Sequence, residues 1–218
     1  MTPLRVTFTF RTRMVVPTVD KPVDGPLCKA AYQQAYFGGH EDPVSQQYCV
    51  GLAKHFVGEQ WCFMASNIVF DWAGPPSPLH YIKRQKIEDY FDAADIGLMR
   101  KMPGFNSSSG AQKAASVLTQ TRQASSATAW LVADDAERVR ELIGRLTHLG
   151  KLAHHDFGAI KDVAVEQDEE ALQRWRSRPL PFGSEVASAS SHALATTALR
   201  PPYWQRTNFV PGLLPLGL

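Results

Sequence analysis

The residues best suited to do chemistry gather in one short segment, residues 150–158, with the sequence Gly-Lys-Leu-Ala-His-His-Asp-Phe-Gly. Glycines at both ends allow this backbone to approach another backbone closely and to present its N–H groups. One lysine and two histidines between them favour an anionic neighbour. An ordinary helix C-cap followed by a polar turn would use the same residues, so the segment alone leaves both interpretations open. The candidate contacts are Gly150, Lys151, His154, His155, Phe157 and Gly158.

The histidines of this region also raise the question of a metal site. His148, His154 and His155 lie near Asp156, and a carboxylate beside imidazoles can bind a divalent cation. Adjacent residues in a short turn point in different directions, and the chain contains no H-x-x-x-H pair. We therefore expect neither a metal nor any other cofactor.

A metal-independent ribonuclease is a second chemical possibility. It needs a general base for the 2′-hydroxyl and a cation for the developing phosphorane. His80 with Lys83, Arg84 and Lys86 has the right groups, and so do the two loop histidines with Lys151. Since nothing in the sequence fixes an acid and a base in one geometry, the simpler interpretation is that these side chains neutralise phosphates, and no catalytic residue is assigned.

Basic residues form local clusters, several of them beside aromatic side chains. Cations with stacking platforms are typical of proteins that bind single-stranded RNA, although each cluster alone is also compatible with a solvated face. The clusters are Arg11 and Arg13; Lys83, Arg84 and Lys86; Arg100 and Lys101; Lys113 and Arg122; and Arg174, Arg176 and Arg178.

The composition sets wider limits. The 218 residues carry a net charge of only +2, so overall charge does not indicate a polyanionic partner. Three separated cysteines and no C-x-x-C pair argue against a disulfide framework and a zinc site, and they suit a reducing cytoplasm. No run approaches the roughly 18 apolar residues of a membrane span, and no signal peptide is evident. We expect a cytoplasmic protein without membrane contact.

The first half of the chain predicts a strand, a helix and two further strands. Alternating apolar residues indicate a strand over 4–10, and Asp24 looks like the N-cap of a helix that ends at Phe37. The later elements are a less regular helix over 43–56, a strand over 60–72, a turn at the prolines of 74–78, and a returning strand over 79–84.

The second half predicts an excursion, then a strand, a helix and a final strand. Residues 93–125 have a polar tip with basic flanks, and the regular elements follow at 127–133, 135–149 and 157–165. The order is that of a ferredoxin-like split βαβ unit, hence an α+β fold with an antiparallel sheet. We expect one domain over 1–182 with an insertion at about 93–125, a short helix over 169–176, and an extended C-terminal tail over 183–218.

Three segments resemble the RAMP superfamily of CRISPR effector proteins, and within it the subunit that caps the crRNA 5′ end in type IV complexes. Residues 3–12 with 14–17 resemble the first strand of the family, and 23–27 resemble its Asp-Gly turn. Residues 150–158 resemble its glycine-rich loop, with Asp156 where the family usually has glycine. The similarity covers about residues 3–182.

This resemblance implies a ferredoxin-like, RRM-like core with an inserted thumb. It implies binding of the crRNA 5′ handle and contacts with a neighbouring CRISPR backbone subunit, the large subunit and target DNA near the flanking motif. The implied subunit is non-catalytic, since a separate endoribonuclease normally trims the crRNA. An endoribonuclease of the same superfamily and a purely structural assembly protein remain alternatives.

The resemblance also implies two sets of contacts. The handle and its phosphate track would involve the loop residues named above together with Arg11, Arg13, His80, Lys83, Arg84 and Lys86. A thumb wedge beside the first guide–target base pairs would involve Met99, Arg100, Lys101, Met102 and Phe105.

Overall fold

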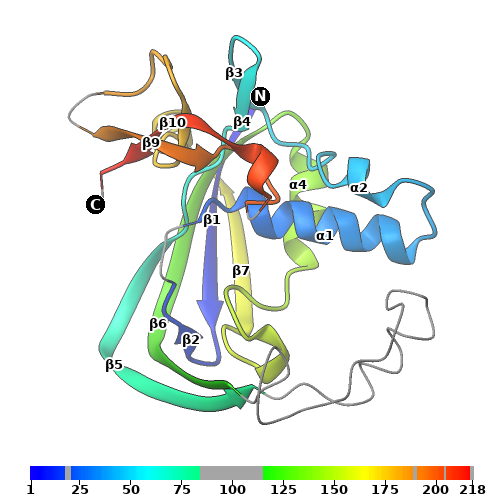
Figure 1. Ribbon diagram of the computed structural model, residues 1–218. Helices are drawn as coiled ribbons and strands as arrows, with labels where there is room; N and C mark the ends of the chain where they lie inside the picture. The colour runs from blue at the N-terminus through cyan, green and yellow to red at the C-terminus, as the bar shows by residue number, and fades with distance from the viewer. Residues whose placement is uncertain (18–20, 84–114, 189–190, 204, 217–218) are drawn as a thin grey trace, which may run out of the picture. The chain divides into compact units, whose positions relative to one another are not determined.

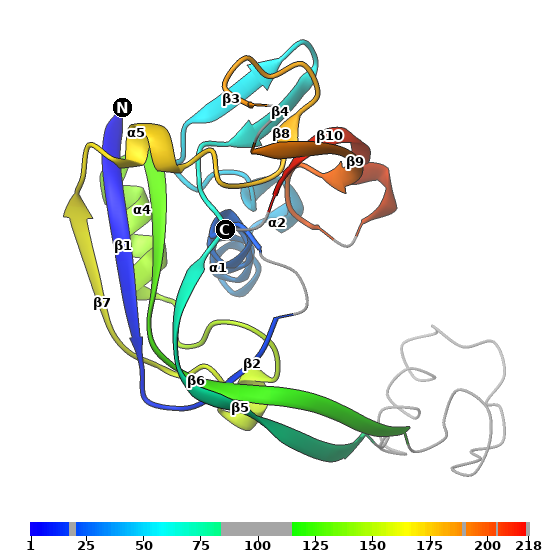
Figure 2. The same cartoon turned by 90° about the vertical axis from the view of Figure 1, so that its left-hand side faces the viewer.

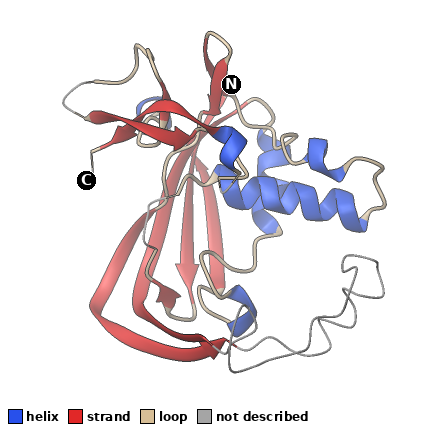
Figure 3. Ribbon diagram, in the orientation of Figure 1, coloured by secondary structure: helices blue, strands red, loops and turns tan. Residues whose placement is uncertain are grey.

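The computed structural model describes residues 1–17, 21–83, 115–188, 191–203 and 205–216. The chain divides into two compact units, Met1–Gly74 with Arg122–Leu218, and Pro75–Thr121. The protein is α+β, with mostly antiparallel sheets and few helices (Figure 3). No helix in the described ranges is both long and apolar enough to cross a membrane.

The main sheet has five strands. Along it the order is β2–β6–β1–β7, and β5 also pairs with β6 (Figure 1). Strand β1 is antiparallel to both neighbours, with Leu4 opposite Leu131 on one side and Gln167 on the other. The strands are β1 (Thr2–Phe10), β2 (Met14–Val15), β5 (Val69–Lys83), β6 (Ala115–Ala133) and β7 (Ile160–Gln167).

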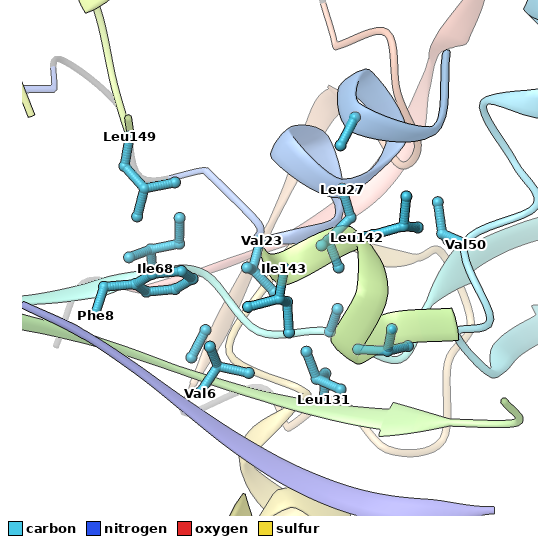
Figure 4. Close-up of a cluster of buried hydrophobic side chains, with 14 of the residues drawn as sticks. Val6, Phe8, Val23, Leu27, Val50, Ile68, Leu131, Leu142, Ile143 and Leu149 are labelled. Carbon is cyan, nitrogen blue, oxygen red and sulfur yellow. The ribbon is translucent and has the colours of Figure 1, made fainter. Parts of the chain in front are cut away.

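The alternation in residues 4–10 correctly predicted β1, because every second side chain enters the core. Leu4, Val6 and Phe8 are fully buried, whereas Arg5 and Thr7 between them are partly exposed. Helices α1 (Asp24–Phe37) and α4 (Ala136–Gly144) cover this face of the sheet. Figure 4 shows Leu27 of α1 and Leu142 and Ile143 of α4 above the strand residues Val6 and Leu131.

The predicted helix caps have different outcomes. Asp135 does cap α4, because its Oδ1 accepts a hydrogen bond of 3.0 Å from the Arg138 N–H. That helix ends at Gly144 and not at Leu149, although Leu149 still packs into the core. The Asp24 prediction is wrong: Val23 is the N-cap residue of α1, and Asp24 is completely buried inside the protein.

The helix expected over 43–56 is wrong beyond its first turn. Helix α2 covers only Pro43–Gln46, and a hairpin of β3 (Lys54–Val57) and β4 (Gln60–Phe63) follows. The chain turns at Gly51, which has φ +74° and whose carbonyl oxygen accepts the N–H groups of Asp134 and Asp135. A tertiary contact at the start of α4 therefore overrides local helix propensity.

The predicted turn at 74–78 is also wrong, because β5 continues through these prolines to Lys83. Prolines have no N–H, so they are tolerated in a strand whose outer edge does not pair. In the described part of the chain, β6 is the only partner of β5. Strand β6 begins at Ala115, so residues 115–125 are strand where an excursion was expected, and residues 84–114 lie outside the described ranges.

The C-terminal segment is more regular than the extended tail that we expected. Strands β8 (Leu180–Pro181), β9 (His192–Ala198) and β10 (Phe209–Pro215) form an antiparallel sheet in the order β8–β10–β9. A second small core of buried side chains joins it to β4, β6 and Trp175. Figure 2 shows this sheet beside the β3–β4 hairpin. The short helix predicted over 169–176 is α5, Ala171–Arg174.

Candidate nucleic-acid interface

The glycine loop, residues 150–158, links the end of the α4 region to β7 and has a tightly constrained backbone. Gly150 has φ +91° and Gly158 has φ +70°. A Cβ added at Gly158 would lie 2.0 Å from the carbonyl oxygen of Leu149, so only glycine fits there. Leu149 and Gly158 are joined by a hydrogen bond of 2.9 Å, which closes the loop at its base.

Two residues other than glycine in this loop also adopt left-handed backbone conformations. Leu152 has φ +59° and Asp156 has φ +63°, on either side of the short 3₁₀ helix η2 (Ala153–His155). Asp156 therefore adopts a conformation that glycine adopts without strain and aspartate tolerates. Left-handed leucine costs on the order of 1 kcal/mol, and such strain persists only where the surrounding structure imposes it.

That surrounding structure is the turn that follows β1, residues 11–13. The Gly158 N–H donates to the Arg13 carbonyl at 2.8 Å, and the Arg11 N–H donates to the Ala159 carbonyl at 3.0 Å. Between them, the Thr12 hydroxyl donates to the Asp156 carbonyl at 2.6 Å and accepts the Ala159 N–H at 2.9 Å. The structure thus brings Arg11 and Arg13 against the glycine loop, and it adds Thr12, which the sequence did not single out.

The surface formed by this turn and loop carries more positive than negative charge. The side chains of Arg11, Arg13, Lys151, His154 and His155 are all exposed. The acidic side chain of Asp156 lies 3.6 Å from Arg11 of this set and 3.1 Å from His148. Exposed pairs of this kind are weak and solvent-screened, so the arginine keeps most of its capacity to bind an anion.

The remaining side chains of the loop add stacking surface rather than fixed acid–base geometry. The imidazole rings of His154 and His155 lie 4.2 Å apart between centroids and are tilted by 46°. Phe157, which follows in sequence after Asp156, is half-buried. Within the described ranges, no group of three or more histidine, cysteine or acidic side chains is arranged to hold a metal ion.

The other residues expected at the site belong to the second unit or lie outside the described residues. His80 lies on β5, in the unit formed by residues 75–121, where its imidazole shares a hydrogen bond with the Ser116 hydroxyl. Lys83 is the last described residue of β5. Arg84, Lys86, Met99, Arg100, Lys101, Met102 and Phe105 lie outside the described residues.

The basic cluster expected at residues 174–178 mainly makes contacts within the protein. Arg178, grouped by sequence with Arg174 and Arg176, is completely buried and pairs with Asp24 at 2.8 Å. Its three nitrogens also donate to Tyr203 and to the carbonyls of Phe63, Ala65, Pro179 and Leu199. Arg174 lies over the Trp130 ring at 4.5 Å and pairs with Glu170. The sequence holds no signal that separates buried Arg178 from its exposed neighbours.

The fold and the exposed basic loop define an α+β protein with a candidate site for a phosphate-bearing ligand. The chain matches the family model of CRISPR type IV associated protein Csf3 over residues 2–215. It belongs to this family, which confirms the resemblance to type IV CRISPR proteins and extends it through β10. A search of curated proteins found no match.

Proposed function

We propose that this chain is a non-catalytic RNA-binding subunit of a type IV CRISPR ribonucleoprotein. Its glycine loop and the adjoining turn 11–13 would hold the crRNA 5′ handle. The observation that carries the proposal is the set of four hydrogen bonds joining the turn to the loop, which gathers exposed cations from two distant parts of the sequence. Membership of the type IV family supplies the biological setting.

The chemistry of the loop suits an RNA backbone. Phosphate oxygens account for much of protein–nucleic acid contact, and they are bound by lysine, arginine and backbone N–H groups. In the described part of the chain, neither Arg13 nor Lys151 forms an ion pair, so both are available for phosphates. The neighbouring imidazole rings of His154 and His155 offer stacking surfaces for unpaired bases.

A ferredoxin-like, RRM-like core belongs to the same proposal. The strand order β5–β6–β1–β7, with α1 between β1 and β5 and α4 between β6 and β7, supports it. We further propose that the chain acts in the cytoplasm and contacts a backbone subunit, the large subunit and target DNA near the flanking motif. His80 and the basic residues from Lys83 onward would extend the phosphate track.

The test is a salt titration of binding to labelled repeat RNA in EDTA, with the wild type compared to the variant R11Q/R13Q/K151Q. The logarithm of the binding constant falls linearly with the logarithm of the salt concentration, and each phosphate contact on a single strand adds about 0.7 to the steepness of this salt slope. Loss of three contacts therefore lowers the salt slope by about 2. The control, R140Q/R145Q/K161Q, removes the same charge from α4, its C-cap and β7, and leaves binding unchanged. An unchanged slope in the loop variant would contradict the proposal and favour a structural assembly role.

The same gel tests the enzyme alternative. Specific cleavage of the repeat RNA in EDTA, lost in H80Q or in H154Q/H155Q, would establish a metal-independent endoribonuclease instead. Intact, shifted RNA is the result that we expect.

A further inference from the structure

A second cluster of cations and aromatic rings lies on the β3–β4 hairpin. The Lys54 ammonium lies 4.7 Å from the centroid of the Trp61 ring, and the Arg200 guanidinium lies 4.9 Å from it. Tyr48 and Phe63 meet the same ring edge-on, and the Tyr48 hydroxyl donates to the Pro201 carbonyl at 2.9 Å. We call Lys54, Trp61 and Arg200 the Trp61 cluster. Its cations are positioned by an aromatic ring rather than by a carboxylate.

The charges of this cluster are not neutralised. Among the described residues, Lys54 and Arg200 form no ion pair, and their side-chain nitrogens donate no hydrogen bond. A cation–π contact attracts the charge but leaves the N–H donors free, in particular the planar fork of arginine. By contrast, Arg138 and Arg140 on α4, and Arg145 directly after it, are all paired with glutamates. The Trp61 cluster is therefore organised to receive an anion.

A cleft of about 280 Å³, lined by both polar and apolar side chains, opens beside Trp61 and Arg200. The side-chain oxygen Oε1 of Gln60, one of its lining residues, is buried and has no hydrogen-bond partner among the described residues. A buried acceptor without a donor costs about 1–3 kcal/mol, which a ligand N–H group would recover. Glu59 lines the same cleft and adds a second acceptor. The volume lies just below the roughly 300 Å³ at which drug-sized pockets begin, so it suits a group of nucleobase size.

From this arrangement we infer that the Trp61 cluster and its cleft bind one nucleotide of a single-stranded nucleic acid. Lys54 and Arg200 bind the phosphate, and Gln60 and Glu59 accept hydrogen bonds from an exocyclic amino group of the base. Cytosine, adenine and guanine carry such a group and uracil does not, so the cleft favours these bases over uracil, because acceptor side chains pair with amino groups. The strand can be RNA or DNA, since both carry this chemistry.

This contact is separate from the glycine loop. Ala133 lies opposite Thr2 at the start of β1 and bridges to Leu52, just before β3. The glycine loop adjoins the other end of β1, where Arg11 is bonded to Ala159. Nine residues of strand span roughly 25–30 Å, so one nucleotide cannot occupy both places. The inference therefore stands or falls independently of handle binding.

The test measures binding of the full chain to oligocytidylate and oligouridylate, as RNA and as DNA, across a salt series. The variant K54Q/R200Q lowers the salt slope by about 1.4, because each lost phosphate contact on a single strand contributes about 0.7. The control R140Q/K161Q removes the same charge and leaves the slope unchanged. Gln60→Leu keeps the slope but reduces the preference for oligocytidylate, and comparison of the RNA and DNA arms identifies the strand.

Three results would overturn the inference: no binding of oligonucleotides by the wild type, equal slopes in the wild type and K54Q/R200Q, or preferential binding of a polyglutamate peptide. The loop variant R11Q/R13Q/K151Q, measured with repeat RNA, separates this outcome from failure of the handle proposal. Thermal melts of each variant establish that the fold is intact before binding is compared.

Discussion

Two arginine–aspartate pairs in this protein have the same chemistry and opposite surroundings. Arg178 and Asp24 are both completely shielded from solvent and meet at 2.8 Å. Arg11 and Asp156 are 61% and 59% exposed and lie 3.6 Å apart. Arg178 directs all three of its nitrogens to protein acceptors, whereas Arg11 keeps most of its donors in water.

The difference shows that burial, and not residue type, decides whether an arginine is saturated by protein acceptors or keeps its donors in solvent. The buried pair joins the start of α1 to residues 63–65, 178–179, 199 and 203, so it connects the C-terminal sheet to the main core. Burial of its hydroxyl end raises the pKa of Tyr203, which keeps that hydroxyl protonated as a donor to Asp24. Among the described residues, the exposed Arg11–Asp156 pair has no comparable set of side-chain hydrogen bonds to other elements.

The largest expected effect separates these two pairs directly. Arg178→Met leaves the Asp24 carboxylate buried without its cation, which lowers the free energy of unfolding by about 3–5 kcal/mol. Arg11→Met, at the exposed pair, changes it by less than about 0.5 kcal/mol. Urea denaturation followed by circular dichroism measures both. Equal effects of the two substitutions would refute the distinction.

A companion variant sharpens the same comparison. Arg178→Met combined with Asp24→Leu removes both buried charges and recovers a large part of the lost stability, because no unpaired carboxylate remains. If the double variant is as unstable as the sum of the single ones, the hydrogen bonds to the backbone carbonyls, and not the charge pair, carry the stability.

The next largest expected effect is the difference in stability between alanine substitutions at the two glycines of the loop. Gly158→Ala forces a Cβ to within 2.0 Å of the Leu149 carbonyl oxygen at a positive φ, so we expect a loss of at least about 2 kcal/mol and weaker RNA binding. At Gly150 the nearest atom to an added Cβ is the flexible Met14 Cε at 3.4 Å. Gly150→Ala therefore costs about 1 kcal/mol, mainly from its backbone conformation. Thermal melts rank the two variants, and the reverse order would contradict the described loop geometry.

The smallest expected effect concerns His55, whose side chain is partly buried. Burial, reinforced by Arg176, lowers the pKa of His55, whose imidazole shares a hydrogen bond of 2.8 Å with the Ser184 hydroxyl. The unfolded chain then binds the proton more readily than the folded one, so the free energy of unfolding falls as the pH drops below about 6.5. His55→Gln removes this contribution. A wild type and variant with identical acid dependence between pH 7 and 5 would exclude it.

Sequence periodicity predicted the elements whose pattern is local. The alternation of residues 4–10 and the spacing of Val139, Leu142 and Ile143 both reflect one buried face, so β1 and α4 follow directly. Elements governed by distant partners were not predictable in this way. Gly51 turns the chain because it contacts the start of α4, and the prolines of 75–78 fit a strand because β6 is its only partner among the described strands.

In the candidate site, too, the features set by neighbouring residues in the sequence were predictable, and those set by distant partners were not. The loop residues 150–158 were predictable because glycines and basic residues lie next to one another in sequence. Their contact with residues 11–13 was not, since it depends on the pairing of β1 with β7 and on the Thr12 hydroxyl. The Trp61 cluster likewise joins Lys54 and Arg200, which are distant in sequence and share no motif.

The central claim is that the glycine loop and the turn 11–13 hold the crRNA 5′ handle, and cross-linking tests it most directly. The handle nucleotides would carry 4-thiouridine in the assembled type IV complex, and cross-linked peptides would be identified by mass spectrometry. We predict adducts within residues 150–158 and 11–13. Handle adducts confined to other parts of the chain, with these residues unmodified, would contradict the claim.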